Sequence, residues 1–125
     1  MYLSKRRSLL PLLTASEAQA NDAFTIDELG VPGIALLEQA GSRVAGATLK
    51  VLQAKGLQRV LVLTGPGNNG GDGWVAARHL QHHQTGLATR LDVEVCVLAL
   101  HPPTALKGNA RVAALAYERS AAALR

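Results

Sequence analysis

The sequence predicts an α/β fold in which helices pack against a parallel sheet. An apolar run from Val60 to Leu63 is followed by a glycine-rich segment and then by a helical pattern. A second apolar run, Val93 to Leu100, follows that helix, and a helical crossover makes the two strands parallel. Two more helical patterns precede the first strand. The 125 residues suffice for one domain but are few for a complete doubly wound sheet.

Residues 1–13 are predicted to be a flexible N-terminal extension. Its apolar run, Leu9 to Leu13, is shorter than a secretory signal requires, and no run in the chain approaches the roughly 18 apolar residues of a membrane span. The first helix is expected from Thr14 to Leu29. Thr14 followed by Glu17 is a capping-box pattern, and Gly30 ends the helix.

A second helix is expected from about Ile34 to Ala54, ended by Gly56. Apolar residues recur along it at helical spacing and predict the face that packs in the core: Ile34, Leu37, Ala40, Val44, Ala47 and Val51. Further along the chain, the strand from Val93 to Leu100 places Glu94 at an edge, and a last helix is expected from Ala110 to Leu124.

The strand Val60 to Leu63 reads as buried on both faces because it is continuously apolar. The loop after it contains glycines that allow positive φ and a close approach of backbone amides to a ligand: Gly65, Gly67, Gly70, Gly71 and Gly73. Asp72 is a natural N-cap for the helix that follows, and it is equally able to contact a ligand. A strand, a glycine loop and a helix N-terminus together form an anion site, because the first helical N–H groups have no intrahelical partner.

The loop departs from two well-known phosphate motifs. Gly65, Gly67 and Gly70 match the dinucleotide pattern G-x-G-x-x-G, yet no carboxylate follows at the end of the second strand to hold a ribose. Gly70 is followed by Gly71 and Asp72, not by the Lys and Ser or Thr of a nucleoside-triphosphate loop. An ordinary dinucleotide-dependent oxidoreductase and a phosphotransferase are therefore disfavoured.

The polar content of the loop points to another ligand chemistry. Asn68, Asn69 and Asp72 supply amide and carboxylate oxygens, which suit a cation or hydroxyl groups. The segment GPGNNGGDGWVAARHL resembles the signature of the YjeF N-terminal domain family, the NAD(P)H-hydrate epimerases. The resemblance extends upstream to GVPG at 30–33 and LLEQAG at 36–41, and downstream to LKGNA at 106–110, where Asn109 replaces the usual Asp. It covers roughly Thr14 to Arg125 and implies a three-layer αβα, Rossmann-like domain, of which this chain is the N-terminal portion.

The resemblance also implies a site. Hydrated NADH or NADPH would be bound by the loop residues Asn68, Asn69, Gly70, Gly71 and Asp72, and Asn69 would also hold a potassium ion. The family's catalytic Asp belongs to a later segment, so the chain is expected to be a fragment whose catalytic residue lies beyond residue 125. A homodimer, fusion to an ADP-dependent dehydratase domain and a cytoplasmic location are further expectations. The alternative is a non-catalytic binding or scaffold module, whose relatives usually lose the Asn-Asn-Gly-Gly-Asp run that this chain retains.

The net charge, the single cysteine and the histidines give weaker indications of function. The formal net charge of +4 comes from scattered Lys and Arg residues with few aromatic side chains, which disfavours nucleic acid as a partner. The single cysteine, Cys96, fits a reducing compartment and is expected to be a small buried side chain. His79, His82 and His83 are expected on a solvated helix end, because no carboxylate or cysteine in that stretch completes a metal site.

Overall fold

The computed structural model describes residues 12–82 and 93–123, and it divides into two compact units, Met1–Val31 and Pro32–Arg125. The first unit contains helix α1, Ala15–Asp27. The second contains α2 (Gly33–Lys55), β1 (Arg59–Thr64), α3 (Asn68–His82), β2 (Glu94–Ala99), the short 3-10 helix η2 (Pro103–Ala105) and α4 (Gly108–Ala123).

Helix α1 begins at the predicted capping box. The backbone N–H of Thr14 donates to Glu17 Oε2 at 2.7 Å, and the backbone N–H of Glu17 donates to Thr14 Oγ1 at 3.3 Å. Two orphan N–H groups are thereby satisfied, which fixes the start of the helix. Gly30 follows the helix at φ 69°, a conformation that favours glycine. None of the α1 residues is buried within the described part of the chain.

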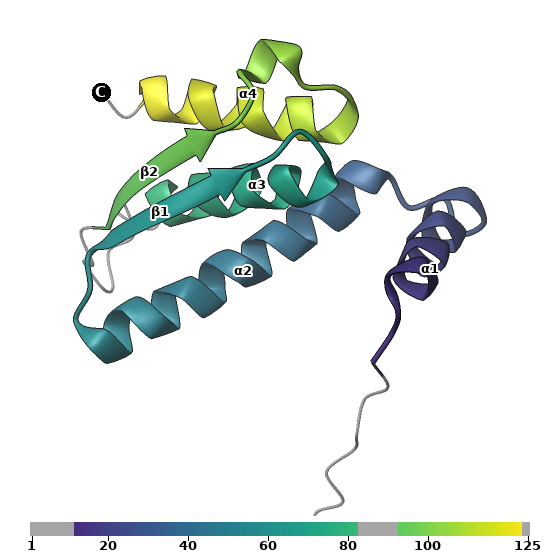
Figure 1. The fold of residues 1–125 in the computed structure, drawn as a ribbon, viewed down its shortest axis with the longest axis horizontal. Coiled ribbons are helices and arrows are strands. Elements are labelled where there is room, and N and C mark those ends of the chain that lie inside the picture. Colours follow the sequence, from purple (N-terminus) through teal and green to yellow (C-terminus); the bar gives the residue numbers. More distant parts are fainter. Residues whose placement is uncertain (1–11, 83–92, 124–125) are drawn as a thin grey trace, which may run out of the picture. The chain divides into compact units, whose positions relative to one another are not determined.

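The second unit is built around a two-stranded parallel sheet. β1 and β2 pair in register from Arg59 with Glu94 to Thr64 with Ala99. Helix α3 lies against one face of both strands, and α2 and α4 flank it on either side (Figure 1). The predicted order of helix, strand, glycine loop, helix and parallel strand is confirmed. The α/β class follows from this crossover, since α3 connects two parallel neighbours.

The core of this unit lies between the sheet and its helical layer. Trp74, Val75 and Leu80 on α3 are almost fully buried. They pack with small and aliphatic residues of the flanking helices and with the inward side chains of both strands: Leu37, Ala45, Ala113, Ala114, Val60, Val95 and Val97. The Trp74 ring also meets Tyr117 of α4 at a centroid distance of 5.3 Å, which extends the packing to the outer helix.

The opposite face of the sheet is exposed over the described residues. Leu61, Leu63 and Leu98 retain 61%, 69% and 56% of their accessible surface, and Cys96 is exposed beside them. The expectation that β1 is buried on both faces is therefore wrong, and so is the expectation of a buried Cys96. The physical reason is alternation: side chains along a strand point to opposite faces, and the described helices cover one of them.

Helix α2 buries a different face from the one predicted. Ile34 and Leu37 pack in or against the core as expected, whereas Val44 and Val51 are about half exposed and Ala40 and Ala47 are also exposed. The buried residues are Leu37, Gly41, Ala45 and Leu52. Gly41 decides this choice, because a Cβ there would lie 2.5 Å from Val75 Cβ and 2.8 Å from the Asp72 carbonyl oxygen. Helix α2 therefore presents Gly41 to α3, and the larger side chains of Val44 and Val51 turn outward.

The lengths of the described helices also bear on membrane insertion. No helix within residues 12–82 and 93–123 is both long and apolar enough to cross a bilayer. Helix α2 is the longest of them at 23 residues, but charged and polar side chains interrupt it.

Candidate functional site

The glycine loop lies at the carboxyl edge of the sheet, between β1 and α3. Helix α3 begins at Asn68, so all five predicted ligand residues, 68–72, lie in its first turns. Asp72 is the fifth residue of the helix, so the prediction that it is the N-cap is wrong. The loop proper shrinks to Gly65, Pro66 and Gly67, and the helix N-terminus itself forms most of the candidate site.

Packing requires two of the glycines. A Cβ on Gly70 would overlap the carbonyl oxygen of Gly65 and lie 2.8 Å from its carbonyl carbon. A Cβ on Gly71 would lie 3.0 Å from Leu37 Cδ2 and 3.2 Å from Ala110 Cα. Both residues are buried, and neither has the positive φ that the sequence interpretation allowed for. Their role is to let the chain fold back closely on itself.

Gly65 and Gly67 differ from the buried pair. A Cβ at either position would meet no atom of the described structure within 4 Å, and neither residue has a positive φ. No packing contact and no backbone conformation explains why these positions lack a side chain. The open space lies directly beside the N-terminus of α3, where a ligand can approach the backbone.

Three helices converge on Gly71. It belongs to the first turns of α3, it lies against Leu37 in the second turn of α2, and it approaches Ala110 in the first turn of α4. Each helix directs the positive end of its macrodipole toward this end of the sheet. Lys107 precedes α4 and is exposed there. This edge therefore favours an anion, as the sequence predicted from α3 alone.

The predicted ligand residues differ in accessibility. Asn68 and Asn69 are exposed, Asp72 is partly buried, and Gly70 and Gly71 are buried. The N–H of Gly71 donates to the Gly67 carbonyl at 3.1 Å, which begins the helical hydrogen bonding. The N–H groups of Asn68, Asn69 and Gly70 come before that point and have no partner within the helix. The buried glycines offer only their backbone to a ligand, whereas the two asparagines are exposed.

Thr64 is the last residue of β1, and no role was predicted for it. It is 2% exposed, and its Oγ1 is buried with no hydrogen-bond partner among the described residues. Its neighbour Gly65 opens the glycine loop. An apolar strand that ends in Thr directly before a glycine loop was the available signal, but burial of the hydroxyl could be seen only in the folded chain.

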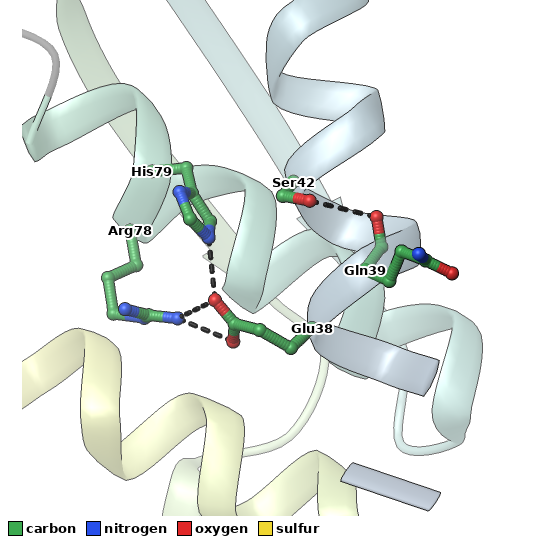
Figure 2. A network of polar contacts seen from close by, with 5 residues as sticks. All are labelled: Glu38, Gln39, Ser42, Arg78 and His79. Atoms are coloured by element: carbon green, nitrogen blue, oxygen red, sulfur yellow. Dashed lines mark hydrogen bonds and ion pairs between the residues drawn. The ribbon is translucent and has the colours of Figure 1, made fainter. Parts of the chain in front are cut away.

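A polar network joins α2 to α3 beside the site (Figure 2). Glu38 accepts hydrogen bonds from Arg78 Nη2 at 2.5 and 2.6 Å and contacts His79 Nε2 at 2.6 Å. His79 was expected to be solvated, and its side chain is 38% exposed, but the pairing with Glu38 was not expected. The carboxylate comes from 41 positions earlier in the sequence, so no local spacing could reveal it. His82 is exposed as expected, and His83 lies outside the described residues.

The network sets the protonation of Glu38. Partial burial raises the pKa of its carboxyl. The hydrogen bonds from His79 and Arg78 and the positive charges of these residues together outweigh burial, so that the pKa lies below the ordinary value of 4.5. The carboxylate form is therefore favoured, and it holds α2 against the middle of α3.

The described residues also bear on metal binding. No group of three or more His, Cys, Asp and Glu side chains that could hold a metal ion occurs in residues 12–82 and 93–123. Asn69 is exposed, and an amide oxygen suits a weakly held monovalent cation. Asn69 thus offers one oxygen ligand for such a cation.

Two hollows of the surface lie away from the loop. One, of about 460 Å³, lies at the amino ends of both strands and is lined by Gly56, Leu57, Gln58, Arg59 and Glu94. The other, of about 540 Å³, is lined by Gln81, Val95, Tyr117, Glu118, Ala121 and Ala122. In α/β folds ligands bind at the carboxyl ends of the strands, so we place the candidate site at the glycine loop and not in either hollow.

A parallel sheet with a glycine loop opening onto the N-terminus of its crossover helix defines an α/β protein of Rossmann-like architecture. The particular family follows from sequence comparison. The chain belongs to the family described as YjeF-related protein N-terminus, whose model matches residues 33–124. The family has a Rossmann-like α/β domain, and this chain is a part of it. The match begins at the start of α2, and α1 lies before it.

Individual relatives agree with the family assignment. The chain is 40% identical over 105 residues to a protein of Rhodopirellula baltica named NAD(P)H-hydrate epimerase, a match that covers 84% of this chain and 38% of that protein. It is 48% identical over 73 residues to a bifunctional NAD(P)H-hydrate repair enzyme Nnr of Salinibacter ruber, with 56% of this chain and 13% of that protein covered.

A relative with another name matches as well. The chain is 40% identical over 99 residues to the chloroplastic pyridoxine/pyridoxamine 5'-phosphate oxidase 1 of Arabidopsis thaliana, with 66% of this chain and 19% of that protein covered. The chain therefore spans between 13% and 38% of the length of these three relatives. Their names describe whole proteins, and the shared segment is a minor part of each.

Proposed function

We propose that the loop and helix N-terminus from Gly65 to Asp72 bind hydrated NADH or NADPH, and that the chain contributes this part of the site to an NAD(P)H-hydrate epimerase. The observation that carries the proposal is the open space at Gly65 and Gly67, next to the first N–H groups of α3, which have no partner within the helix. The pyrophosphate of a dinucleotide is an anion that fits such N–H groups. The relatives named NAD(P)H-hydrate epimerase supply the substrate and the isomerase reaction.

The proposed role is positioning. Inverting the carbon that bears the added hydroxyl needs an acid/base group beside the nicotinamide ring and a site that holds the phosphates still. The glycine loop supplies the second requirement. We assign no catalytic acid or base to any described residue, and we expect that group in a segment after residue 125.

Potassium is part of the proposal. The exposed Asn69 amide would contribute one oxygen ligand to the ion, and a bound cation would favour the negatively charged dinucleotide beside it. Asn68 is equally exposed and adjacent in the sequence, so it serves as a matched control.

The test is calorimetric titration of the chain with hydrated NADH and separately with NADH, each in potassium and in sodium buffers. We expect selective binding of the hydrate that is stronger in potassium. Asn69→Ala should remove the potassium dependence, and Asn68→Ala should retain it. Equal binding of NADH and its hydrate would contradict the substrate assignment. Potassium dependence unchanged in Asn69→Ala would contradict the ion site.

The second candidate is a non-catalytic binding or scaffold module. It is favoured by the occurrence of the same segment in the Arabidopsis protein, whose name describes another reaction. The intact run from Asn68 to Asp72 favours a ligand site, since a scaffold has no need of exposed amides beside an open helix N-terminus. Binding of neither nucleotide in the titration would favour the scaffold.

Assembly and location complete the proposal. The relatives named as bifunctional repair enzymes support a second domain in the same polypeptide, for which we propose an ADP-dependent dehydratase. We also propose a homodimer and a cytoplasmic location, the latter because a single free cysteine fits a reducing compartment.

A further inference from the structure

The buried hydroxyl of Thr64 makes no hydrogen bond that supports the fold of the described residues. Its Oγ1 is shielded from solvent and has no hydrogen-bond partner among the described residues. Leaving a buried hydroxyl unpaired costs free energy, so such a group in a native protein calls for an explanation. A valine would fill the same volume without that cost.

The local sequence explains why the hydroxyl is unpaired. Threonine at such a position commonly accepts a hydrogen bond from the N–H two residues later, but that residue is Pro66, which has none. The backbone of Thr64 is already engaged, since its carbonyl accepts from the N–H of Leu100 at 3.0 Å. The methyl group faces α3, where a Cβ on Gly73 would lie 3.0 Å from Thr64 Cγ2.

Peptide geometry identifies a partner. A trans peptide holds its N–H and C=O on opposite sides, so a loop peptide that turns its N–H outward to a ligand turns its carbonyl inward. The Gly67 carbonyl already accepts from Gly71. The preceding peptide, between Pro66 and Gly67, carries the N–H of Gly67, a residue at which an added Cβ would meet no atom within 4 Å. Its carbonyl needs a donor when it turns inward.

We propose that Thr64 is a positioning residue whose hydroxyl donates to the Pro66 carbonyl when the Gly67 N–H is turned toward the bound ligand. This inference rests on the proposed function of the loop. The hydrogen bond forms only in the ligand-bound state, so its free energy contributes to binding and not to the stability of the free chain.

Two substitutions separate this role from packing. Thr64→Val removes the hydroxyl and keeps the methyl that faces Gly73, whereas Thr64→Ser keeps the hydroxyl and removes the methyl. We expect free Thr64→Val to melt at or above the wild-type temperature and to bind hydrated NADH about tenfold more weakly, which corresponds to one hydrogen bond. Thr64→Ser should melt at a lower temperature and bind close to wild-type affinity.

The outcomes distinguish the inference from the function on which it rests. Wild-type binding with unchanged affinity in Thr64→Val overturns the role of Thr64 and leaves the loop site intact. Melting of Thr64→Val well below wild type overturns it too, because the hydroxyl would then have a partner in the free chain. Failure of the wild-type chain itself to bind hydrated NADH overturns the proposed function, and the role of Thr64 with it.

Discussion

The glycines of the loop fall into an inner pair and an outer pair that exist for different reasons. Gly70 and Gly71 are buried, and a Cβ on either would press on the Gly65 backbone or on neighbouring helices. Gly65 and Gly67 have open space around them. The inner pair is required by the fold, whereas for the outer pair we propose a ligand that approaches from outside. The same residue type therefore serves packing at one position and, in this proposal, ligand access at another.

The largest expected effect breaks the inner pair. Gly70→Ala would place a methyl group on the Gly65 carbonyl, and backbone cannot move aside as a flexible side chain can. We expect a loss of about 3 kcal/mol or more in the free energy of unfolding, enough to threaten folding of a small chain. Urea unfolding followed by circular dichroism would measure it. Wild-type stability in this variant would show that the loop does not fold back closely.

Gly67→Ala changes a glycine of the outer pair and is the matched control for Gly70→Ala. Its methyl group enters open space, so we expect a change in stability within about 0.5 kcal/mol. The same methyl occupies the path of the proposed ligand, so calorimetry should show weaker binding of hydrated NADH. A variant that binds as wild type would remove the reason given for the outer glycines.

A smaller effect concerns the network that holds α2 against α3 and so supports the inner pair. The pKa of Glu38 is lowered in the folded chain, so its stabilising contribution is present above the unfolded value of 4.5 and is lost as pH falls through the folded value. The side chain is 43% exposed, which limits the contribution to roughly 0.5–1 kcal/mol. Glu38→Gln should be less stable at neutral pH by that amount.

Measurement of urea midpoints across pH would test this sign. The difference in stability between wild type and Glu38→Gln should shrink as the solution is acidified below the ordinary carboxyl pKa. The Glu38 carboxylate of the wild type is then protonated and loses its charge. Glu94→Gln removes an exposed carboxylate outside the network and serves as the control. A difference that stays constant with pH would mean that charge does not carry the effect of Glu38.

The smallest expected effect lies on the uncovered face of the sheet. Cys96 is exposed there beside Leu61, its register partner on β1, so Cys96→Ser should change the free energy of unfolding by less than about 0.5 kcal/mol. The chain has one cysteine, and a thiol reagent therefore reports this face alone. Labelling of the folded chain should be nearly as fast as in urea. Slow labelling would show that something covers the face.

Local patterns predicted much of the chain. The capping box of Thr14 and Glu17, the helix stop at Gly56 with φ 63°, and the loop that joins β1 to α3 were all visible as sequence signals. Each depends on residues a few positions apart, whose geometry the backbone fixes. The candidate site could be proposed from sequence for the same reason, because its five predicted ligand residues are consecutive.

Features that depend on distant residues were predicted poorly. The buried face of α2 is set by the fit of Gly41 to Val75, and the partner of His79 is Glu38 on another helix. Burial of Cys96 was overestimated because an apolar strand does not indicate whether one face or both are covered. In each case the deciding contact joins elements that the sequence places far apart.

The sequence by itself determined the order of helices and strands, the family, and the position of the glycine loop, since these follow from periodicity, capping and a contiguous motif. Only the tertiary structure decided which glycines are needed for packing, where α3 begins, and that the buried Thr64 hydroxyl has no hydrogen-bond partner among the described residues. The physical reason is that steric exclusion and hydrogen-bond satisfaction are properties of atoms brought together by folding. The type of a residue is given by the sequence, but the contacts that require that type form only in the folded chain.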